Sequence, residues 1–269
     1  MIEACIFADE VSKDFDEAVR LSVEAGARGV ELRGGIWGRA VQTCTDEDVE
    51  KMKEVLVTYG ARIDVIGSPV GKCDINNEEE YQTHLQWFDR MCELAHAFDT
   101  RVIRGFAFWT PNREERARPN LDEWLPLIAE KMAPIVRKAE EENVLYCLET
   151  ECSTMTGTCE ETARVIDALG GSEVLGSAWD VNNGWGGGEL PYPDGYSHIR
   201  GRVYHVHVKP NAANNIDTVS STDLTYDEVL RVLKSDGYDG AASIEHWGSP
   251  ELMLEGVRQL VPLLDRVNG

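Results

Sequence analysis

Short apolar runs alternate with amphipathic segments along most of the chain. Residues 29–33 and 61–69 are typical of short buried strands, and residues 45–61 between them have the apolar spacing of a helix. That helix is predicted to begin at Thr45, with acidic residues in its first turn, and to end at Gly60. The same unit of strand and helix recurs, so the pattern predicts an α/β fold.

The recurring unit extends through eight strands and about eight helices. The predicted strands are residues 1–10, 29–33, 61–69, 100–109, 145–149, 173–180, 203–209 and 240–246. Seven of the helices have clear bounds in the sequence, at residues 12–29, 45–61, 78–97, 121–144, 158–171, 224–240 and 249–267. A polar loop is predicted at 111–120 and a glycine-rich loop at 182–196. This pattern predicts a single (β/α)8 TIM barrel, forming one domain over residues 1–269. An open doubly wound sheet is the alternative, but no G-x-G-x-x-G follows the first strand.

Candidate chemistry is concentrated where four of the predicted strands end. In the strand VYHVHVK, His205 and His207 alternate with apolar residues and so share one side. Carboxylates stand at the ends of three other strands, at Glu149, Asp180 and Glu245. All strands of such a barrel run parallel, and its active site lies at their C-terminal ends. We therefore expect these three acids and His207 to converge on one rim, with His205 deeper, as a hydrogen-bonded residue rather than a ligand.

Three carboxylates brought together inside a barrel repel one another unless protons or a cation neutralise them. A divalent metal does this most simply, so the sequence predicts one ion held by Glu149, Asp180, His207 and Glu245. An oxygen-rich set with one imidazole favours Mn²⁺, Mg²⁺ or Co²⁺, and Zn²⁺ fits less well without thiolates. The sequence does not decide among these ions, and we take Mn²⁺ as the first choice.

Other polar and aromatic residues near the same strand ends are candidates for substrate contacts. Lys209 is expected either to bind a substrate or to form a salt bridge to the acidic cluster, and Arg104 and Arg33 have the same two alternatives. Aromatic side chains just beyond strand ends, including Trp109 and Trp247, offer faces that pack against the apolar side of a sugar ring. Phe108 and Trp185 belong to the same aromatic group.

Composition and charge narrow the class of partner. The 269 residues include 48 acidic and 26 basic side chains, for a net charge of −22. Such a chain repels the phosphate backbone, so we expect no nucleic-acid partner.

No signal segment or membrane span is recognisable, and we expect a cytoplasmic protein without a membrane partner. The 7 cysteines are scattered without a C-x-x-C pair, which favours reduced thiols. The acidic surface is compatible with a homo-oligomer.

Several motifs resemble one known superfamily over nearly the whole chain. The segments GVELR, IGSPVGKC, VIRGFAFW, CLETE, WDVNN, YHVHVKP and GYDGAASIEHW are similar to those of the sugar phosphate isomerase/epimerase superfamily with the xylose isomerase-like TIM barrel. The resemblance implies one divalent ion bound by Glu149, Asp180, His207 and Glu245. It also implies that Glu149 and Glu245 remove and return a proton beside a metal-polarised carbonyl, through an enediolate.

The resemblance leaves the reaction open. Many relatives have a histidine where this chain has Asn183, which hydrogen-bonds a hydroxyl but is no base, and no arginine follows His207 between residues 210 and 221. We expect a metal-dependent isomerase or epimerase of a sugar or keto-sugar, with a small-molecule sugar or polyol as its partner. The alternatives are a lyase, either a dehydratase of a cyclic polyol or a keto-glycoside deglycosidase, and a sugar-binding barrel without catalysis.

Overall fold

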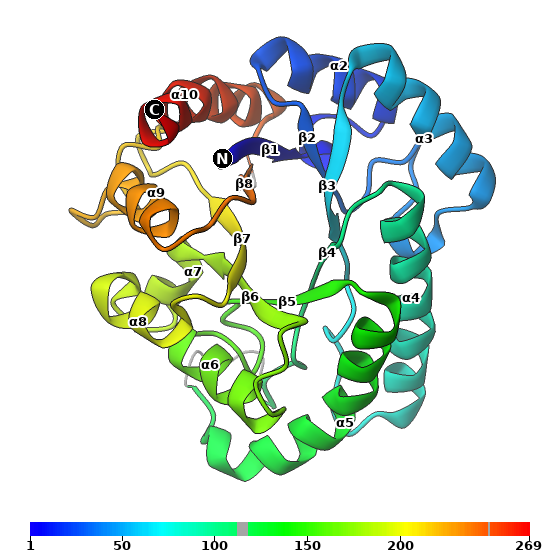
Figure 1. Ribbon diagram of the computed structural model, residues 1–269, viewed down its shortest axis with the longest axis vertical. Helices are drawn as coiled ribbons and strands as arrows, with labels where there is room; N and C mark the ends of the chain where they lie inside the picture. The colour runs from blue at the N-terminus through cyan, green and yellow to red at the C-terminus, as the bar shows by residue number, and fades with distance from the viewer. Residues whose placement is uncertain (112–117, 247) are drawn as a thin grey trace.

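Eight parallel strands close into a barrel in this computed structural model, which describes residues 1–111, 118–246 and 248–269 (Figure 1). The strands are β1 Glu3–Phe7, β2 Gly29–Leu32, β3 Arg62–Gly67, β4 Val102–Gly105, β5 Leu145–Glu149, β6 Leu175–Asp180, β7 Val203–Val208 and β8 Ala241–Ile244. Each strand pairs with the next, and β8 pairs with β1, where Cys5 lies opposite Ser243. The predicted single (β/α)8 TIM barrel is confirmed.

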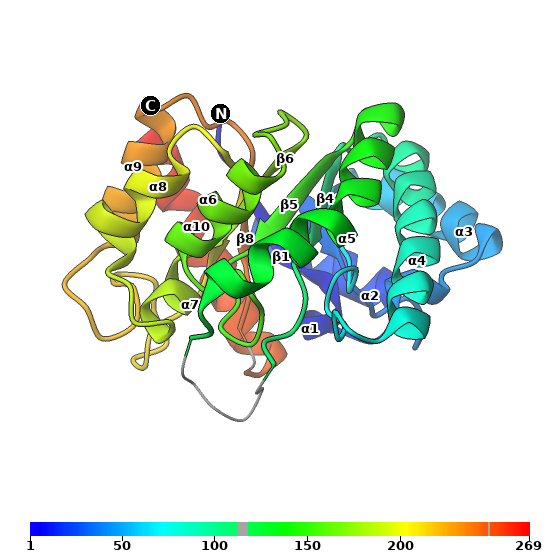
Figure 2. The ribbon, with the colours of Figure 1, turned by 90° about the horizontal axis from the view of Figure 1, so that it is seen from below.

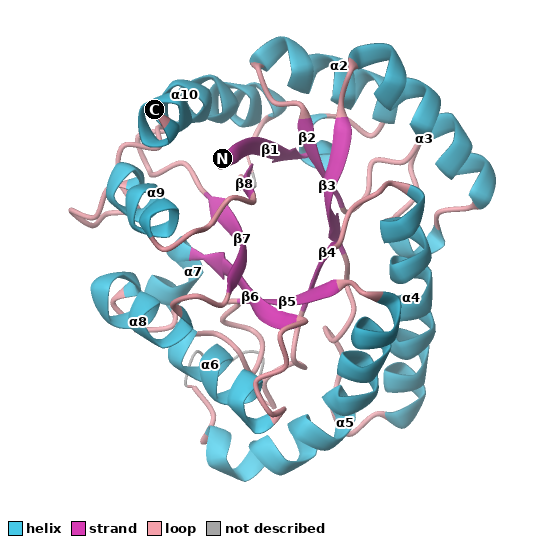
Figure 3. Cartoon of the chain, viewed as in Figure 1, coloured by secondary structure: helices cyan, strands magenta, loops and turns pink. Residues whose placement is uncertain are grey.

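Helices surround the barrel and alternate with its strands (Figure 3). They are α1 Ala8–Val11, α2 Phe15–Ala25, α3 Asp46–Tyr59, α4 Glu78–Ala97, α5 Leu121–Glu142, α6 Cys159–Ala168, α7 Val181–Gly186, α8 Tyr196–Ile199, α9 Tyr226–Ser235 and α10 Pro250–Asn268. Their starts follow the sequence signals. Thr45 accepts from the Asp48 amide while the Asp48 carboxylate accepts from the Thr45 amide, a reciprocal cap also present at Thr158 and Thr225. Among the described residues, no helix is long and apolar enough to cross a membrane.

The glycine-rich segment differs from the prediction. Residues 182–196 were expected to form a loop, but the structure has α7, a short helical turn at Pro191–Gly195 and the start of α8. The Asp180 carboxylate accepts a hydrogen bond of 2.8 Å from the Asn183 amide and so caps α7. The Tyr196 ring stacks on the buried Trp179, with centroids 5.1 Å apart. Capping and packing therefore order a segment whose glycines predicted irregular structure.

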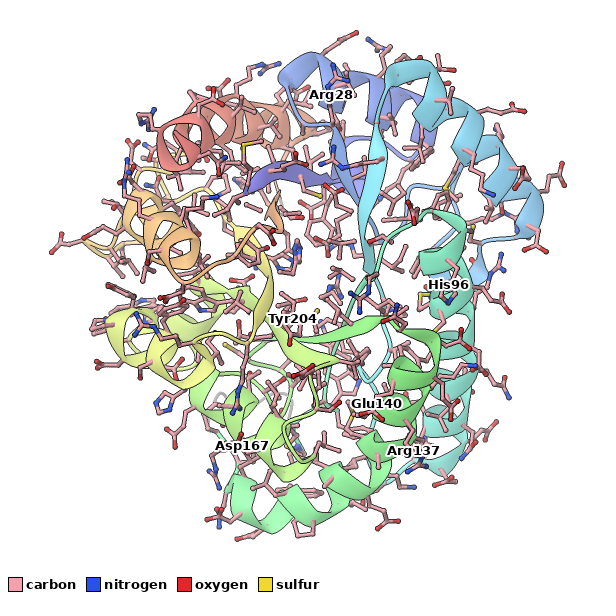
Figure 4. The ribbon with its side chains drawn as sticks, in the orientation of Figure 1. Arg28, His96, Arg137, Glu140, Asp167 and Tyr204 are labelled. Carbon is pink, nitrogen blue, oxygen red and sulfur yellow. The ribbon has the colours of Figure 1, made fainter. Side chains whose placement is uncertain are left out.

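The two ends of the barrel are distinct. Both chain termini lie at one end, and the short helices α1 and α7, which follow β1 and β6, lie at the opposite end (Figure 2). Figure 2 shows the molecule from below the view of Figure 1 and has both termini at its top, so Figures 1 and 4 face the end of the barrel where the termini lie and the strands begin. Tyr204, at the beginning of β7, is labelled in Figure 4. The C-terminal ends of the strands, where the candidate residues were predicted, face away from the viewer.

Polar residues fill the barrel interior toward the C-terminal ends of the strands, and small apolar residues fill it toward the N-terminal ends. Cys5, Val65 and Ala241 pack together toward the N-terminal ends. Further along, Glu31, His205 and His207 are fully buried. Register places His205 opposite Ala178 and His207 opposite Ser243, so small neighbours leave room for both imidazoles.

Candidate metal centre and adjoining pocket

The four strand-end residues converge as the sequence predicts. One potential ligand atom from each of Glu149, Asp180, His207 and Glu245 lies within 4.8 Å of the others, and all four residues are buried. The Nδ1 atom of His207 is 3.8 Å from Glu149 Oε1, 3.7 Å from Asp180 Oδ2 and 3.5 Å from Glu245 Oε2. The imidazole therefore faces one oxygen of each carboxylate.

A buried carboxylate on the opposite side holds the imidazoles in place. Glu31 Oε2 is 2.8 Å from His205 Nε2 and 3.4 Å from His207 Nε2. The edge of the Phe7 ring packs against the His207 ring, with centroids 5.2 Å apart. His205 thus has the hydrogen-bonded role expected of it, and His207 directs Nδ1 toward the acids while Nε2 faces Glu31. A carboxylate beyond the imidazole is the usual way to orient a ligating histidine.

An arginine pairs with each of the two glutamates. Arg104 Nε is 3.2 Å from Glu149 Oε2, and the Arg33 guanidinium is 3.3 Å from Glu245 Oε1. In both glutamates the other oxygen is the one that faces His207. Each carboxylate is thereby fixed in rotation, with one oxygen held by a guanidinium and the second directed to the centre.

Lys209 supplies the positive charge closest to the acids. Its Nζ is 2.6 Å from Asp180 Oδ2 and 3.1 Å from Glu245 Oε2, the same two oxygens that face His207 Nδ1. It also donates a weak hydrogen bond of 3.4 Å to Asn183 Oδ1. Of the two alternatives for Lys209, the salt bridge to the acidic cluster is therefore present. Arg104 is likewise ion-paired, to Glu149 and, at 3.5 Å, to Glu31.

The protonation equilibria of this cluster are strongly perturbed. Burial raises the pKa of Glu149 to about 7, although Arg104 and His207 act in the opposite direction. Burial would also raise the pKa of Asp180, but Lys209 and His207 lower it to about 2. The pKa of His207 is raised well above its usual value because Glu31 and the other carboxylates outweigh its burial. The carboxylates thus favour positive charge at the centre.

The residues present fit a divalent metal. Three buried carboxylates and an imidazole supply mainly oxygen donors, as hard and borderline divalent ions prefer. His207 Nδ1 is buried and has no hydrogen-bond partner within the described part of the chain, although such atoms are normally paired. Its separations of 3.5–3.8 Å from the carboxylate oxygens suit donors arranged around one central ion.

A pocket of about 290 Å³ adjoins the four residues at this end of the barrel. It is lined by Arg33, Ala40, Gln42, Gly67, Ser68, Pro69, Lys72, Arg104, Phe106, Glu149, Glu151, Lys209 and Glu245. A volume of this size corresponds to a small-molecule site. The two candidate catalytic glutamates and the predicted substrate residues Arg104 and Lys209 therefore line one cavity. Asp180 and His207 are not among its lining residues, although both contact residues that are.

The remaining predicted contacts have different outcomes. Asn183 and Trp109 are not among the residues that line this pocket, although Asn183 contacts Lys209 and the Trp109 ring lies 5.2 Å from Lys72 Nζ. Trp247 lies outside the described residues. Phe108 was expected in an aromatic pocket wall, but its side chain is fully buried against Tyr81.

The sequence alone does not identify three of the residues that lie in or beside the candidate site. Glu31, Lys72 and Glu151 lie in segments whose motifs were recognised, but no role was assigned to them. For Glu31 a signal existed, because in GVELR it alternates with Val30 and Leu32 and so faces the barrel interior. For Lys72 and Glu151 there was none, since both lie in loops whose course depends on contacts with other segments.

One of these loops, residues 68–73, is hydrogen-bonded to the segment that follows β4. Val70 O accepts from the Phe106 amide at 2.9 Å, and Gly71 O accepts from the Phe108 amide at 2.7 Å. On its other side the Gly71 amide donates to the buried His84 Nδ1 at 3.1 Å. Lys72 is thus presented to the pocket from a backbone held on two sides.

Replacing Gly71 by alanine is expected to disrupt this loop. Gly71 has φ of +80°, and a Cβ there would lie 1.9 Å from the Phe106 carbonyl oxygen, so both strain and a backbone clash oppose the change. We expect a loss of about 1–3 kcal/mol in the free energy of unfolding, measured by urea denaturation. Gly170→Ala is the matched control, since Gly170 also has positive φ but open space around it. Equal losses in the two variants would contradict the clash.

A closed parallel barrel with three carboxylates and a histidine at its C-terminal rim defines a (β/α)8 protein with a candidate metal centre. The chain belongs to the family of xylose isomerase-like TIM barrels, whose model matches residues 19–263. No curated protein matches the chain by sequence.

Solved structures share the fold at low sequence identity. A D-tagatose 3-epimerase-like protein has a TM-score of 0.78 and 18% identity, covering 99% of this chain and 98% of its own. A xylose isomerase-like TIM barrel protein from Mycobacterium smegmatis, in complex with magnesium, has a TM-score of 0.75 and 17% identity over 100% and 97% of the two chains. The probable 3-DHS dehydratase AsbF from Bacillus anthracis has a TM-score of 0.74 and 19% identity over 97% and 99%.

Proposed function

We propose that the protein is a divalent-metal-dependent isomerase or epimerase of a sugar or keto-sugar. The observation that carries the proposal is the convergence of Glu149, Asp180, His207 and Glu245 beside a small-molecule pocket. These four residues would hold one ion, with Mn²⁺ as the first choice and Mg²⁺, Co²⁺ or Zn²⁺ as the other candidates. The magnesium bound to the similar mycobacterial barrel is consistent with an oxygen-rich site of this kind.

The chain's own residues supply the proton transfers. A bound divalent ion contributes positive charge that polarises a substrate carbonyl and makes the neighbouring C–H more acidic. Glu149 at the end of β5 and Glu245 just after β8 both line the pocket, from parts of the barrel wall that are not adjacent. In the proposed reaction one glutamate takes the proton and the other returns one to the opposite face, which epimerises the carbon. Proton return by the same glutamate would give isomerisation.

Binding and orientation are assigned to the residues around these two glutamates. Arg104 and Lys209 line the pocket, where their N–H groups can donate to substrate oxygens beyond the carboxylates they already contact. Arg104 also donates to the Ser68 carbonyl at 2.9 Å, which fixes its guanidinium. Asn183 accepts a hydrogen bond from Lys209 and would help to orient it. Phe106 supplies an aromatic face of the pocket wall, while Trp109 would act indirectly, through its contact with Lys72.

A lyase is the second candidate, supported by the similarity of the fold to a probable dehydratase. Both reactions begin with removal of a proton next to a carbonyl, and they differ in whether a β-substituent then leaves. The same two glutamates would serve, one as base and the other as the acid for the leaving group.

Exchange of substrate protons with solvent distinguishes these functions. The Mn²⁺-loaded protein, incubated with a panel of ketoses in D₂O, is expected to incorporate one deuterium at the carbon next to the carbonyl, detected by mass spectrometry. Incorporation should stop after removal of the metal with EDTA and return when Mn²⁺ is restored. A lyase would instead produce the absorbance of a conjugated enone. If neither signal arises with any metal across ketoses, keto-glycosides and cyclic polyols, a binding protein replaces the proposal.

A further inference from the structure

The pocket beside the candidate metal centre has a charge composition unlike the rest of the protein. Four of its lining residues are basic, Arg33, Lys72, Arg104 and Lys209, and three are acidic. The whole chain has 26 basic against 48 acidic residues, so basic side chains are enriched in this one cavity. An acidic protein that gathers cations in a pocket raises the local concentration of anionic ligands there.

Three of the four cations are already engaged by the buried acids. Arg33 contacts Asp9 and Glu10 as well as Glu245, and its shortest separation is 2.8 Å, to Glu10 Oε1. Arg104 lies between Glu31 and Glu149, and Lys209 between Asp180 and Glu245. These cations balance the carboxylates that a metal ion would also neutralise.

Lys72 differs from these three in what holds its ammonium group. Its Nζ lies over the Phe106 ring, 4.4 Å from the centroid, and 5.2 Å from the centroid of Trp109. Within the described residues its ion-pair partner is Glu151, at a long separation of 3.4 Å, and about a quarter of the Lys72 side chain is exposed. An ammonium has three donors, so two remain for a ligand when one is directed at Glu151. Aromatic faces hold a cation in place without neutralising its charge.

The position of Lys72 relative to the metal centre suits one end of a short substrate. The Phe106 ring contacts both Lys72 and Arg104, since its centroid is 4.4 Å from Lys72 Nζ and 4.9 Å from the Arg104 guanidinium carbon. Arg104 in turn contacts Glu149. Lys72 therefore shares an aromatic neighbour with the arginine that contacts Glu149, and it lines the same pocket. The loop that carries Lys72 is fixed by hydrogen bonds on two sides.

We propose that the substrate is a sugar acid, whose carboxylate binds Lys72 while its carbonyl end lies beside Glu149 and Glu245. The position of the carbonyl end rests on the proposed function. The position of the carboxylate rests on the charges of the pocket. A charge-assisted hydrogen bond from an ammonium to a carboxylate is stronger than one to a neutral hydroxyl. Lys72 is accordingly a specificity-determining residue.

Matched pairs of sugars that differ only at C6 test this directly. Dissociation constants would be measured by calorimetry with the Mg²⁺-loaded protein, for D-tagaturonate against D-tagatose and for D-fructuronate against D-fructose. We expect the wild-type protein to bind the acid about 10- to 100-fold more tightly, the range for a hydrogen bond to a charged group. In Lys72→Met this ratio should fall to near one, and Lys72→Arg should restore most of it.

Lys51→Met is the matched control, because Lys51 also lies over an aromatic ring, that of Trp37, but does not line the pocket. It should keep the wild-type ratio. Equal or weaker binding of the acids by the wild-type protein would overturn the proposal. A preference that survives in Lys72→Met would overturn the role of Lys72. Tighter binding of D-fructose 6-phosphate than of D-fructuronate would contradict the proposal that the group bound by Lys72 is a carboxylate.

Binding and turnover are measured separately, so the two proposals fail in different ways. If the protein shows no deuterium exchange but still prefers acids through Lys72, the proposed isomerase or epimerase activity is wrong and the proposal of a sugar-acid ligand stands. If the protein exchanges protons of neutral ketoses but shows no preference for acids, the sugar-acid ligand is wrong and the proposed activity stands.

Discussion

Replacing either Glu149 or Glu245 by glutamine is expected to slow exchange of the substrate's α-proton by about 10²- to 10⁴-fold, the usual contribution of a general acid–base group. Glutamine keeps the size of the side chain, but its amide cannot take up a proton near neutral pH. Both residues line the pocket, and both direct one oxygen toward His207 Nδ1. Initial rates of deuterium incorporation, measured at saturating Mn²⁺, give the size of the loss.

A folded but inactive variant is the outcome that supports these roles. Burial raises the pKa of Glu149 to about 7, so its charged form is disfavoured inside the barrel and the neutral amide should not lower the melting temperature of the metal-free protein. Glu140→Gln is the control for the chemical change, since Glu140 lies on α5 at the opposite end of the barrel and contacts Ser172 (Figure 4). The two-carboxylate mechanism is wrong if both pocket variants exchange protons at the wild-type rate.

The barrel and the convergence of its strand-end residues were predictable because they depend on local patterns. Alternation of apolar residues defined the strands, and parallel strands bring their C-terminal ends to one rim whatever the loops do. Glu149, Asp180 and His207 needed no knowledge of distant contacts beyond this. The short helix α7 was missed because its start depends on the Asp180 side chain, which caps it and also faces the candidate metal centre.

The second layer of the site depends on pairings across long stretches of sequence. Glu31 contacts His205 from 174 positions away, and neither neighbourhood in sequence indicates the other. Lys72 reaches the pocket because its loop is hydrogen-bonded to the segment after β4, and its charge is held by Phe106, which no periodicity reveals. Phe108 shows the converse, because a residue at a strand end turned into the core. Strand position therefore predicts ligand candidates better than it predicts pocket walls.

Adding Mn²⁺ to the metal-free protein is expected to raise its melting temperature, and Asp180→Asn should remove most of that increase. A ligand that binds only the folded state at 100 times its Kd stabilises that state by about 2.7 kcal/mol. For a chain of this size the shift amounts to about 5 to 10 °C. Asp180 is fully buried, and its Oδ2 faces both His207 Nδ1 and the Lys209 ammonium. The substitution removes a negative charge from the centre, while the amide oxygen can still accept from the Asn183 amide and cap α7.

Calorimetric scans at increasing Mn²⁺, Mg²⁺, Co²⁺ and Zn²⁺ would also rank the ions for this donor set. Asp167→Asn is the matched control, because Asp167 is an exposed partner of Arg202 at the far end of the barrel (Figure 4), and it should keep the wild-type shift.

Lys209 contacts the two oxygens that an ion would share with His207, so a bound divalent ion has to displace part of this ammonium contact. The shift should consequently be larger in Lys209→Met, which lacks the competing charge. If no ion shifts the wild-type protein, or if Asp180→Asn shifts as far as Asp167→Asn, the four residues do not form a metal site.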